Sequence, residues 1–166
     1  SITNEELVAS YNAYVDSFNE KNKQDIESGD VAPMPYSSAE FIEKASGIKS
    51  RYIYQKEGAL DIERMKPKIS PRSDDVLSHQ AEIAVEAARL ALDSANVNAQ
   101  EIDAVIVSCA YTQRAYPAIA IEVQEALNIE GFGFDMLVAC SAATFGMHRA
   151  FEMLSAGNAS RVLVIN

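Results

Sequence analysis

The stretch GFGFDMLVACSAATFGMHRAFEMLSAG, residues 131–157, decides the fold because it joins an apolar run directly to a helical pattern. Residues 131–139 are mostly apolar and predict a strand, and residues 141–157 predict a helix that ends near its last glycine. Cys140 lies at the junction. A strand that turns directly into a helix is typical of parallel α/β sheets, in which ligands gather at the carboxyl ends of the strands.

The segments around this stretch continue the alternation. Residues 102–110 (IDAVIVSCA) form an apolar run typical of a strand buried on both faces, and residues 161–166 predict a third strand. Residues 117–129 predict a helix with Pro117 in its first turn. The order of strand and helix predicts an α/β fold with a mostly parallel sheet, helices on both faces and right-handed crossovers.

A long alanine-rich helix is predicted before the first of these strands, over residues 73–97. Its small side chains predict close packing on the sheet. We expect one buried face formed by Val76, Ile83, Ala84, Ala87, Ala88 and Ala91.

Residues 1–72 lack this alternation, so we expect them to form an extension with loops before an α/β core of residues 73–166. Thr3 and Glu6 have the spacing of a capping box and predict the start of a first amphipathic helix. The elements expected after it are a break at Gly29, Pro33 and Pro35, a short helix over residues 38–46 stopped by Gly47, and a short strand over residues 51–54.

Composition limits the classes of function. The chain has 166 residues, of which 48% are hydrophobic, so it can form one domain with a sizeable core. Its formal charge of -10 would repel nucleic acid and anionic membrane surfaces, so neither is an expected partner. We find no basic leader and no apolar stretch long enough to span a bilayer, and we expect a cytoplasmic protein.

Cys140 is a candidate nucleophile because of its place at a helix start. We expect the N–H groups of about Ser141 to Thr144 to point toward its sulfur, and the helix dipole favours a thiolate there. A buried structural cysteine is the alternative. Cys109 also ends a strand but has no helix directly after it, so packing is its expected role. Two cysteines are too few for a disulfide scaffold or a cysteine metal cage, and we expect no metal.

The two histidines are weak candidates for a base that would assist Cys140. His148 is eight residues further along the same helix, which places it about 12 Å along the axis. His79 lies in the earlier alanine-rich helix, and a position on the helix face is expected for both. The chain therefore has a candidate nucleophile without an evident partner base.

Residues 63–166 resemble the amino-terminal half of β-ketoacyl-acyl-carrier-protein synthase III, in the thiolase-like superfamily. The resemblance lies in the segments IDAVIV, AYP, a helix containing glutamine, FD, and AC at a helix start. TNEEL and SGIKSRYI resemble the family's first helix and its TGI segment, so the resemblance covers most of the chain. The long acidic stretch between Tyr11 and Tyr36 resembles a subgroup with a longer extension.

The chain departs from the family pattern in two ways. Family members begin with a strand and a glycine-containing turn, and they have a carboxy-terminal repeat of the fold that supplies a histidine and an asparagine. We therefore expect an incomplete thiolase-like fold, with the first strand and the repeat absent. Residues 1–166 would be the amino-terminal domain of a condensing enzyme and would be inactive alone.

The resemblance implies a reaction and its site. Cys140 would take an acyl group from an acyl-coenzyme A, and malonyl-acyl-carrier protein would then condense with it after losing carbon dioxide. The N–H of Cys140 would be one oxyanion donor. Phe41 would lie near the coenzyme A adenine, and Tyr116 would cross a homodimer interface and bound the partner's acyl pocket. Core packing is an equal alternative for both aromatics. The resemblance implies no cofactor, because coenzyme A enters as the substrate's thioester.

Other functions stay open at this point. Another thiolase-like condensing enzyme, such as a hydroxymethylglutaryl or polyketide-type synthase, would share the cysteine but differ in substrate. A partner subunit of a heterodimer would carry an unused cysteine, and a test with an acyl-coenzyme A would separate it from a synthase. A nucleotide-binding Rossmann domain is disfavoured because no G-x-G-x-x-G follows a strand.

Overall fold

The computed structural model describes all residues, 1–166. The chain divides into two compact units, Ser1–Pro71 and Arg72–Asn166, each of which is described by itself. None of the helices is both long and apolar enough to cross a membrane.

The second unit is built on a parallel sheet of three strands, as the alternation predicts. β3 (Ala104–Cys109) is central, with β4 (Phe132–Leu137) on one side and β5 (Val162–Ile165) on the other. Both pairings are parallel, and Cys109 is opposite Leu137 at the carboxyl ends of β3 and β4. The first five residues of β3 are buried, which confirms the prediction from its continuous apolar run.

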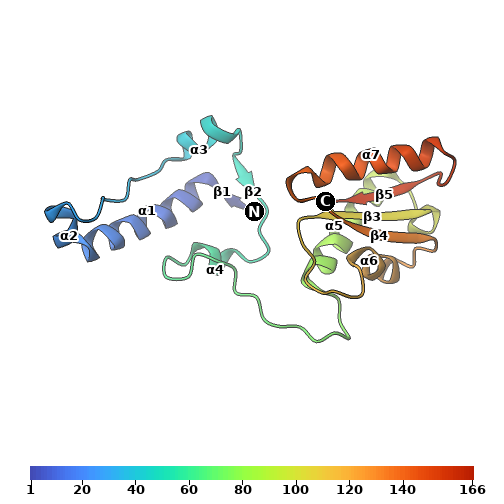
Figure 1. Ribbon diagram of the computed structural model, residues 1–166, viewed down its shortest axis with the longest axis horizontal. Helices are drawn as coiled ribbons and strands as arrows, with labels where there is room; N and C mark the ends of the chain where they lie inside the picture. The colour runs from blue at the N-terminus through green and yellow to red at the C-terminus, as the bar shows by residue number, and fades with distance from the viewer. The chain divides into compact units, whose positions relative to one another are not determined.

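Helices cover both faces of this sheet, as predicted (Figure 1). α5 (His79–Ala95) and α6 (Ile119–Leu127) pack with Val105 and Val107 on one face. α7 (Ala142–Ser155) covers the other face, where Ala150 and Met153 pack with Ala104 and Ile106. Two short 3₁₀ turns complete the unit, η1 (Ala99–Glu101) and η2 (Ala139–Ser141).

The predicted buried face of α5 is wrong for four of its six residues. Val76 precedes the helix, which begins at His79 after its N-cap Ser78. Ile83, Ala87 and Ala91 are exposed, whereas Ala84 and Ala88 are buried as predicted. The helix has two apolar stripes, and the one that meets the sheet and α6 consists of Ala81, Ala84, Val85, Ala88 and Leu92.

The start of α6 also differs from the prediction. Pro117 lies outside the helix, which begins at Ile119. The peptide bond between Tyr116 and Pro117 is cis. The cap comes from another element, because the Asp135 carboxylate of β4 accepts hydrogen bonds from the N–H groups of Ile119 (2.8 Å) and Ala120 (2.9 Å). A carboxylate at this position also matches the positive end of the helix dipole.

The first unit is mainly helical. α1 (Asn4–Lys21) begins with the predicted capping box of Thr3 and Glu6. α3 (Ala39–Ser46) ends at Gly47, which is in the left-handed conformation. The strand predicted over residues 51–54 is wrong beyond Arg51, because Tyr52 is 95% exposed and unpaired with any strand. The remaining elements are β1 (Ile2–Thr3), antiparallel to β2 (Ser50–Arg51), and the short helices α2 (Lys23–Ser28) and α4 (Lys56–Leu60).

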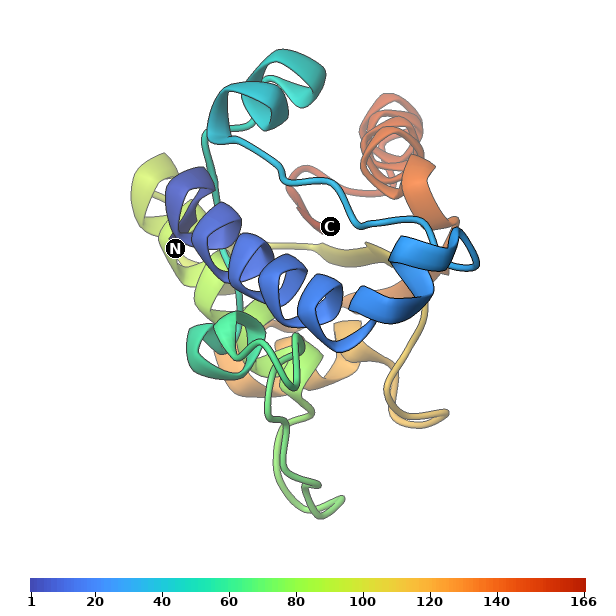
Figure 2. The ribbon, with the colours of Figure 1, turned by 90° about the vertical axis from the view of Figure 1, so that its left-hand side faces the viewer.

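The segment between α2 and α3 runs back along α1 (Figure 2). Two asparagines of α1 hold it: the Asn12 amide donates to Ser37 O (3.1 Å), and the Asn19 amide donates to Met34 O (3.1 Å). In return, the N–H groups of Ser37 and Met34 donate to the same two side chains. Side chains of α1 thus satisfy backbone groups of a segment that has no regular structure of its own.

Candidate active site

Cys140 lies in a tight turn between β4 and α7. β4 ends at Leu137, η2 contains Cys140, and α7 begins at Ala142. Ala139, just before the cysteine, has a φ of 47°, a left-handed conformation that is uncommon for residues other than glycine. Cys140 is exposed, so it is not the buried structural cysteine that was the alternative reading of the sequence.

The backbone of this turn leaves one N–H group at the cysteine unused. Val138 N–H donates to Cys109 O (3.2 Å), and Ser141 N–H donates to Val138 O (3.1 Å). Ala142 N–H donates to Ala139 O. The expectation that the N–H groups from Ser141 onward are free is therefore wrong for the first two of them, because the turn itself uses them. The N–H of Cys140 donates to no group of the chain, so it is available to a ligand.

Cys109 is in a setting that disfavours a thiolate. It ends β3, it is partly buried, and its sulfur donates to Tyr111 O (3.3 Å). Burial raises the pKa of the Cys109 thiol, and the Asp135 carboxylate raises it further. Of the two cysteines, Cys140 is the more exposed and thus the more accessible to a reagent.

The two histidines lie on helices α7 and α5. His148 is exposed, and its Nε2 lies 3.3 Å from Glu152 Oε1, one turn further along α7. His79 is the first residue of α5, where its backbone N–H donates to Gln113 Oε1 (3.0 Å). His148 lies on a helix face, as expected. His79 also lies on its helix, at the first residue of α5.

The loop of residues 110–118, between β3 and α6, lies at the same end of the sheet as Cys140. This follows from the parallel pairing of β3 with β4, whose carboxyl ends are side by side. The loop carries Tyr116, which is 87% exposed, and Tyr111, which is also exposed. Core packing is therefore excluded for Tyr116 within this unit.

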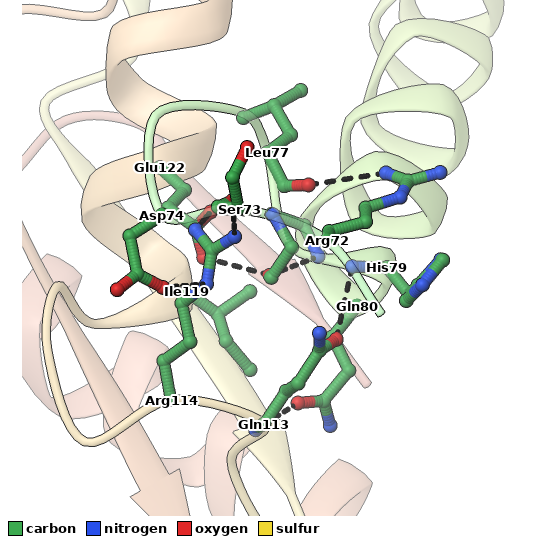
Figure 3. Close-up of polar contacts among 12 residues, drawn as sticks. Arg72, Ser73, Asp74, Leu77, His79, Gln80, Gln113, Arg114, Ile119 and Glu122 are labelled. Atoms are coloured by element: carbon green, nitrogen blue, oxygen red, sulfur yellow. Dashed lines mark hydrogen bonds and ion pairs between the residues drawn. The ribbon is translucent and has the colours of Figure 1, made fainter. Parts of the chain in front are cut away.

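Buried polar contacts hold this loop against the start of α5 (Figure 3). Arg114 Nη1 lies 3.2 Å from Glu122 Oε1 on α6, and the side chains are only 10% and 6% exposed. The Glu122 carboxylate also accepts from the N–H and the hydroxyl of Ser78, each at 2.7 Å. Arg114 Nη2 donates to Ser73 O (2.7 Å), and its Nε lies 3.5 Å from Asp74 Oδ1.

A second set of contacts holds the same loop through two glutamines. The N–H of Gln113 donates to Gln80 Oε1 (2.5 Å), and Gln80 Nε2 donates to Tyr111 O (2.9 Å). The side chain of Gln113 accepts from the His79 N–H in turn (Figure 3). Sequence reasoning missed Gln80 and Gln113, because their partners are 31 to 34 positions away and no short motif marks them.

Phe41 belongs to the first unit, where it is on α3 and 65% exposed. It lines an apolar groove of about 720 Å³ together with residues of α1, α4 and the segment before α3. The residues that line the groove with it are Leu7, Val8, Ser10, Tyr11, Pro35, Tyr36, Ser37, Ser38, Ile42, Ala59 and Met65. The structure thus brings Cys140 and Tyr116 to one end of the sheet and places Phe41 in a separate unit.

A parallel α/β unit with an exposed cysteine at a strand-to-helix turn defines a class, and solved structures identify it as thiolase-like. The chain superposes on 3-oxoacyl-[acyl-carrier-protein] synthase III from Aquifex aeolicus with a TM-score of 0.55 at 27% identity, over 77% of this chain and 35% of that one. Xanthomonas campestris OleA shares the fold, with a TM-score of 0.61 at 21% identity, over 98% of this chain and 38% of that one.

Curated relatives are more specific. The chain is 50% identical over 157 residues to β-ketodecanoyl-[acyl-carrier-protein] synthase of Pseudomonas aeruginosa, which covers 95% of this chain and 45% of that protein. It is 30% identical to β-ketoacyl-[acyl-carrier-protein] synthase III of Bartonella henselae, over 86% of this chain and 38% of that protein. A scan against protein-family models gave no match. The chain is homologous to β-ketoacyl-acyl-carrier-protein synthases of type III, and it spans less than half of their length.

Proposed function

We propose that the full-length protein is a condensing acyltransferase of fatty acid biosynthesis. It transfers an acyl group from coenzyme A to Cys140 and then condenses that group with malonyl-acyl-carrier protein. The observation that carries the proposal is the exposed Cys140 at the strand-to-helix turn, in a chain that is 50% identical to a β-ketodecanoyl-acyl-carrier-protein synthase. The competing possibility is a non-catalytic subunit of a heterodimer, in which Cys140 is unused.

In the first step, the Cys140 thiolate attacks the carbonyl carbon of the acyl thioester. The carbonyl oxygen becomes an oxyanion, and the unused N–H of Cys140 is a donor for it. The carbon–sulfur bond to coenzyme A then breaks, and coenzyme A leaves as a thiolate that takes up a proton from water. The acyl group remains on Cys140 as a new thioester.

In the second step, malonyl-acyl-carrier protein loses carbon dioxide, and its α-carbon keeps the electron pair. This carbanion attacks the acyl carbonyl, and the bond to Cys140 breaks with release of the thiolate. The product is a 3-oxoacyl-acyl-carrier protein, two carbons longer than the primer. We assign no residue of this chain to the decarboxylation, for which the resemblance implies a histidine and an asparagine of the carboxy-terminal repeat.

The name of the Pseudomonas relative gives a primer length. A β-ketodecanoyl product has ten carbons, of which malonyl-acyl-carrier protein supplies two, so its primer has eight. We extend this to the present protein and take octanoyl-coenzyme A as the preferred primer. The exposed Tyr116 would bound the acyl pocket across a homodimer, and Phe41 would contact the adenine of coenzyme A.

The test is acylation of the full-length protein with radiolabelled acyl-coenzyme A primers. Their length ranges from about two to about twelve carbons, so that it brackets the expected eight-carbon primer. We expect label on the peptide with Cys140, most rapidly from the octanoyl primer, and a 3-oxoacyl product after addition of malonyl-acyl-carrier protein. Cys140→Ser should lose the label, because a serine hydroxyl needs a strong base to act as a nucleophile. Cys109→Ser is the matched control and should keep it. If no primer labels Cys140, the result would favour the alternative, a non-catalytic subunit of a heterodimer.

A further inference from the structure

Residues 30–38, here called the strap, connect α2 to α3 and run along α1 (Figure 2). None of these residues is buried, and between Val31 and Ser38 the strap has no hydrogen bond from backbone to backbone. Backbone contacts fix only its ends. Val31 N–H donates to Asp25 O (3.1 Å), and at the other end Ser38 O accepts from Ile42 N–H (3.2 Å). The middle of the strap therefore depends on side-chain contacts with α1 for its position.

Two asparagines of α1 hold the middle of the strap much as a neighbouring strand would. The Asn12 amide donates to Ser37 O (3.1 Å), and its Oδ1 accepts from Ser37 N–H (2.9 Å). Asn19 makes the same two bonds with Met34, at 3.1 and 2.9 Å. Seven residues of helix advance about 10.5 Å along the axis, and three residues of extended chain span about 10 Å. The spacing of the two asparagines thus matches that of Met34 and Ser37.

The other contacts of the strap are also hydrogen bonds of side chains. The Tyr36 hydroxyl donates to the Asp16 carboxylate of α1. The Tyr11 hydroxyl donates to Pro35 O (3.2 Å). Met34 precedes Pro35, which confines it to extended conformations and suits it to a strap without a helix of its own. Segments that are held by a few exposed or half-exposed hydrogen bonds open at a lower free energy than packed helices. The strap can therefore open while α1 stays folded.

The strap is also one wall of the apolar groove that contains Phe41. Its residues 35–38 line the groove together with side chains of α1 and α3, among them Leu7 and Ile42. If the strap opened, the groove would lose this wall. A group that binds in the complete groove would thus favour the closed strap, and the closed strap would favour that group by the same factor.

We propose that the strap is a clamp, held closed by Asn12 and Asn19, and that its closure strengthens the binding of the nucleotide end of coenzyme A in the groove. The proposal rests on the proposed function, in which Phe41 contacts the adenine of coenzyme A. Asn12 and Asn19 bind the strap and do not line the groove, so they are positioning residues. They would act on affinity for the substrate and not on the reaction at Cys140.

The experiment uses the full-length protein and compares Asn12→Ala, Asn19→Ala, their combination and Asn12→Asp with the wild type. Glu20→Ala is the matched control, because Glu20 is an exposed residue of the same helix. Amide hydrogen exchange is followed for residues 31–38 and for α1, with and without coenzyme A. The KM and kcat for acylation are measured with octanoyl-coenzyme A and with octanoyl-pantetheine, a thioester that lacks the nucleotide.

We expect each alanine variant to speed the exchange of the strap amides by about tenfold, because each asparagine makes two of the bonds that hold the strap, while α1 exchanges as before. Asn12→Asp should also speed it, since a carboxylate oxygen would then face Ser37 O. Coenzyme A should slow the exchange of the strap in the wild type and much less in the double variant.

In the kinetic measurement, the double variant should raise the KM for octanoyl-coenzyme A by about tenfold with little change in kcat, because it weakens binding and not chemistry. Its values for octanoyl-pantetheine should stay those of the wild type, since this thioester has no nucleotide for the clamp to hold. Glu20→Ala should match the wild type in both measurements.

Three results would overturn the proposal. Unchanged exchange of the strap in both alanine variants would show that the asparagines do not hold it. Faster exchange of α1 to the same extent would show that they stabilise the whole first unit. Equal rises in KM for both thioesters would show that the strap does not act through the nucleotide. If the double variant does not fold, Tyr36→Phe gives the comparison, because it loses the bond to Asp16 but keeps the ring that lines the groove.

Failure of the proposed function has a different pattern. The wild-type protein would then be acylated by neither thioester, and the proposal would fall with its ligand. If the clamp alone is wrong, the wild type is acylated by both thioesters, and coenzyme A leaves the exchange of residues 31–38 unchanged.

Discussion

Ser108 and Gly146 set how closely α7 approaches the sheet at the end where Cys140 lies. Ser108 is buried in β3, and its hydroxyl has no hydrogen-bond partner in the chain. A Cβ at Gly146 would lie 2.5 Å from Ser108 Oγ and 3.0 Å from Val164 Cγ1. The absence of a side chain at Gly146 therefore allows α7 to rest directly on β3 and β5.

This contact predicts opposite effects of two small substitutions in the full-length protein. Ser108→Ala should raise the free energy of unfolding by about 1 kcal/mol, because it removes a buried unpaired hydroxyl. Gly146→Ala should lower it by about 1–3 kcal/mol, because the new methyl group overlaps Ser108. Urea unfolding measures both.

Thr144→Ala, at an exposed position of α7, is the control for the glycine substitution and should change stability little. The double variant Gly146→Ala with Ser108→Gly should recover part of the loss, since it clears the overlapping atom. A loss of stability in Ser108→Ala would contradict the prediction and would show that the hydroxyl has a partner.

Sequence alone located Cys140 because the signal is local: an apolar run, a cysteine and a helical pattern follow one another. Arg114 and Glu122 gave no such signal, since their contacts to Ser73 and Ser78 join segments far apart in the chain. The sequence also did not indicate that Asp135 caps α6, because this acceptor lies in the next strand.

At the scale of elements, Asp103 ties the start of β3 to the start of β5. Its carboxylate accepts from the N–H groups of Ser160 (2.6 Å) and Arg161 (3.0 Å), and its own N–H donates to Arg161 O (3.0 Å). These bonds fix the register of β3 against β5 just ahead of their first paired residues, Ala104 and Val162.

Asp103 predicts a dependence of stability on pH. The N–H groups of Arg161 and then Ser160 lower the pKa of Asp103, and the Arg161 charge contributes least. Its stabilisation is therefore present above the unfolded pKa of about 3.9 and is lost as pH falls through the lower folded pKa. Asp103→Asn should flatten the decline of stability at acid pH.

Urea unfolding from neutral to acid pH measures this decline in the full-length protein. Asp93→Asn, on α5, is the matched control for the removal of one carboxylate, and any change in slope that both variants share is subtracted. An equal slope in wild type and Asp103→Asn would show that other carboxylates dominate the acid response.

The strands of the second unit were predictable because their apolar runs are continuous and short. The buried face of α5 was not, because the helix carries a second apolar stripe with Ile83 and Leu90. Helical periodicity gives both stripes equal weight, and only the packing of α6 and the sheet decides between them. In the first unit, the start of α1 at Thr3 and the end of α3 at Gly47 were predictable, because helix capping depends on residues close in sequence.

For the molecule as a whole, the second unit leaves much apolar surface uncovered. β4 and β5 are both edge strands, with only β3 between them. The exposed large apolar side chains of its helices are Ile83, Leu90, Ile121, Phe145, Met147, Phe151 and Leu154. The chain also spans less than half the length of the relatives it matches. Surfaces of this kind mark interfaces or sites of aggregation.

We therefore expect residues 1–166, expressed alone, to self-associate and to take up no acyl label on Cys140. The stripe of α5 is one cause, so Ile83→Lys with Leu90→Lys should reduce association by placing charge on it, whereas Glu86→Gln on the same helix should not. Size-exclusion chromatography with light scattering gives the mass of each variant. A monodisperse wild-type monomer with a cooperative thermal transition would contradict the expectation. It would show that a stable monomer can leave all of these apolar side chains exposed to water.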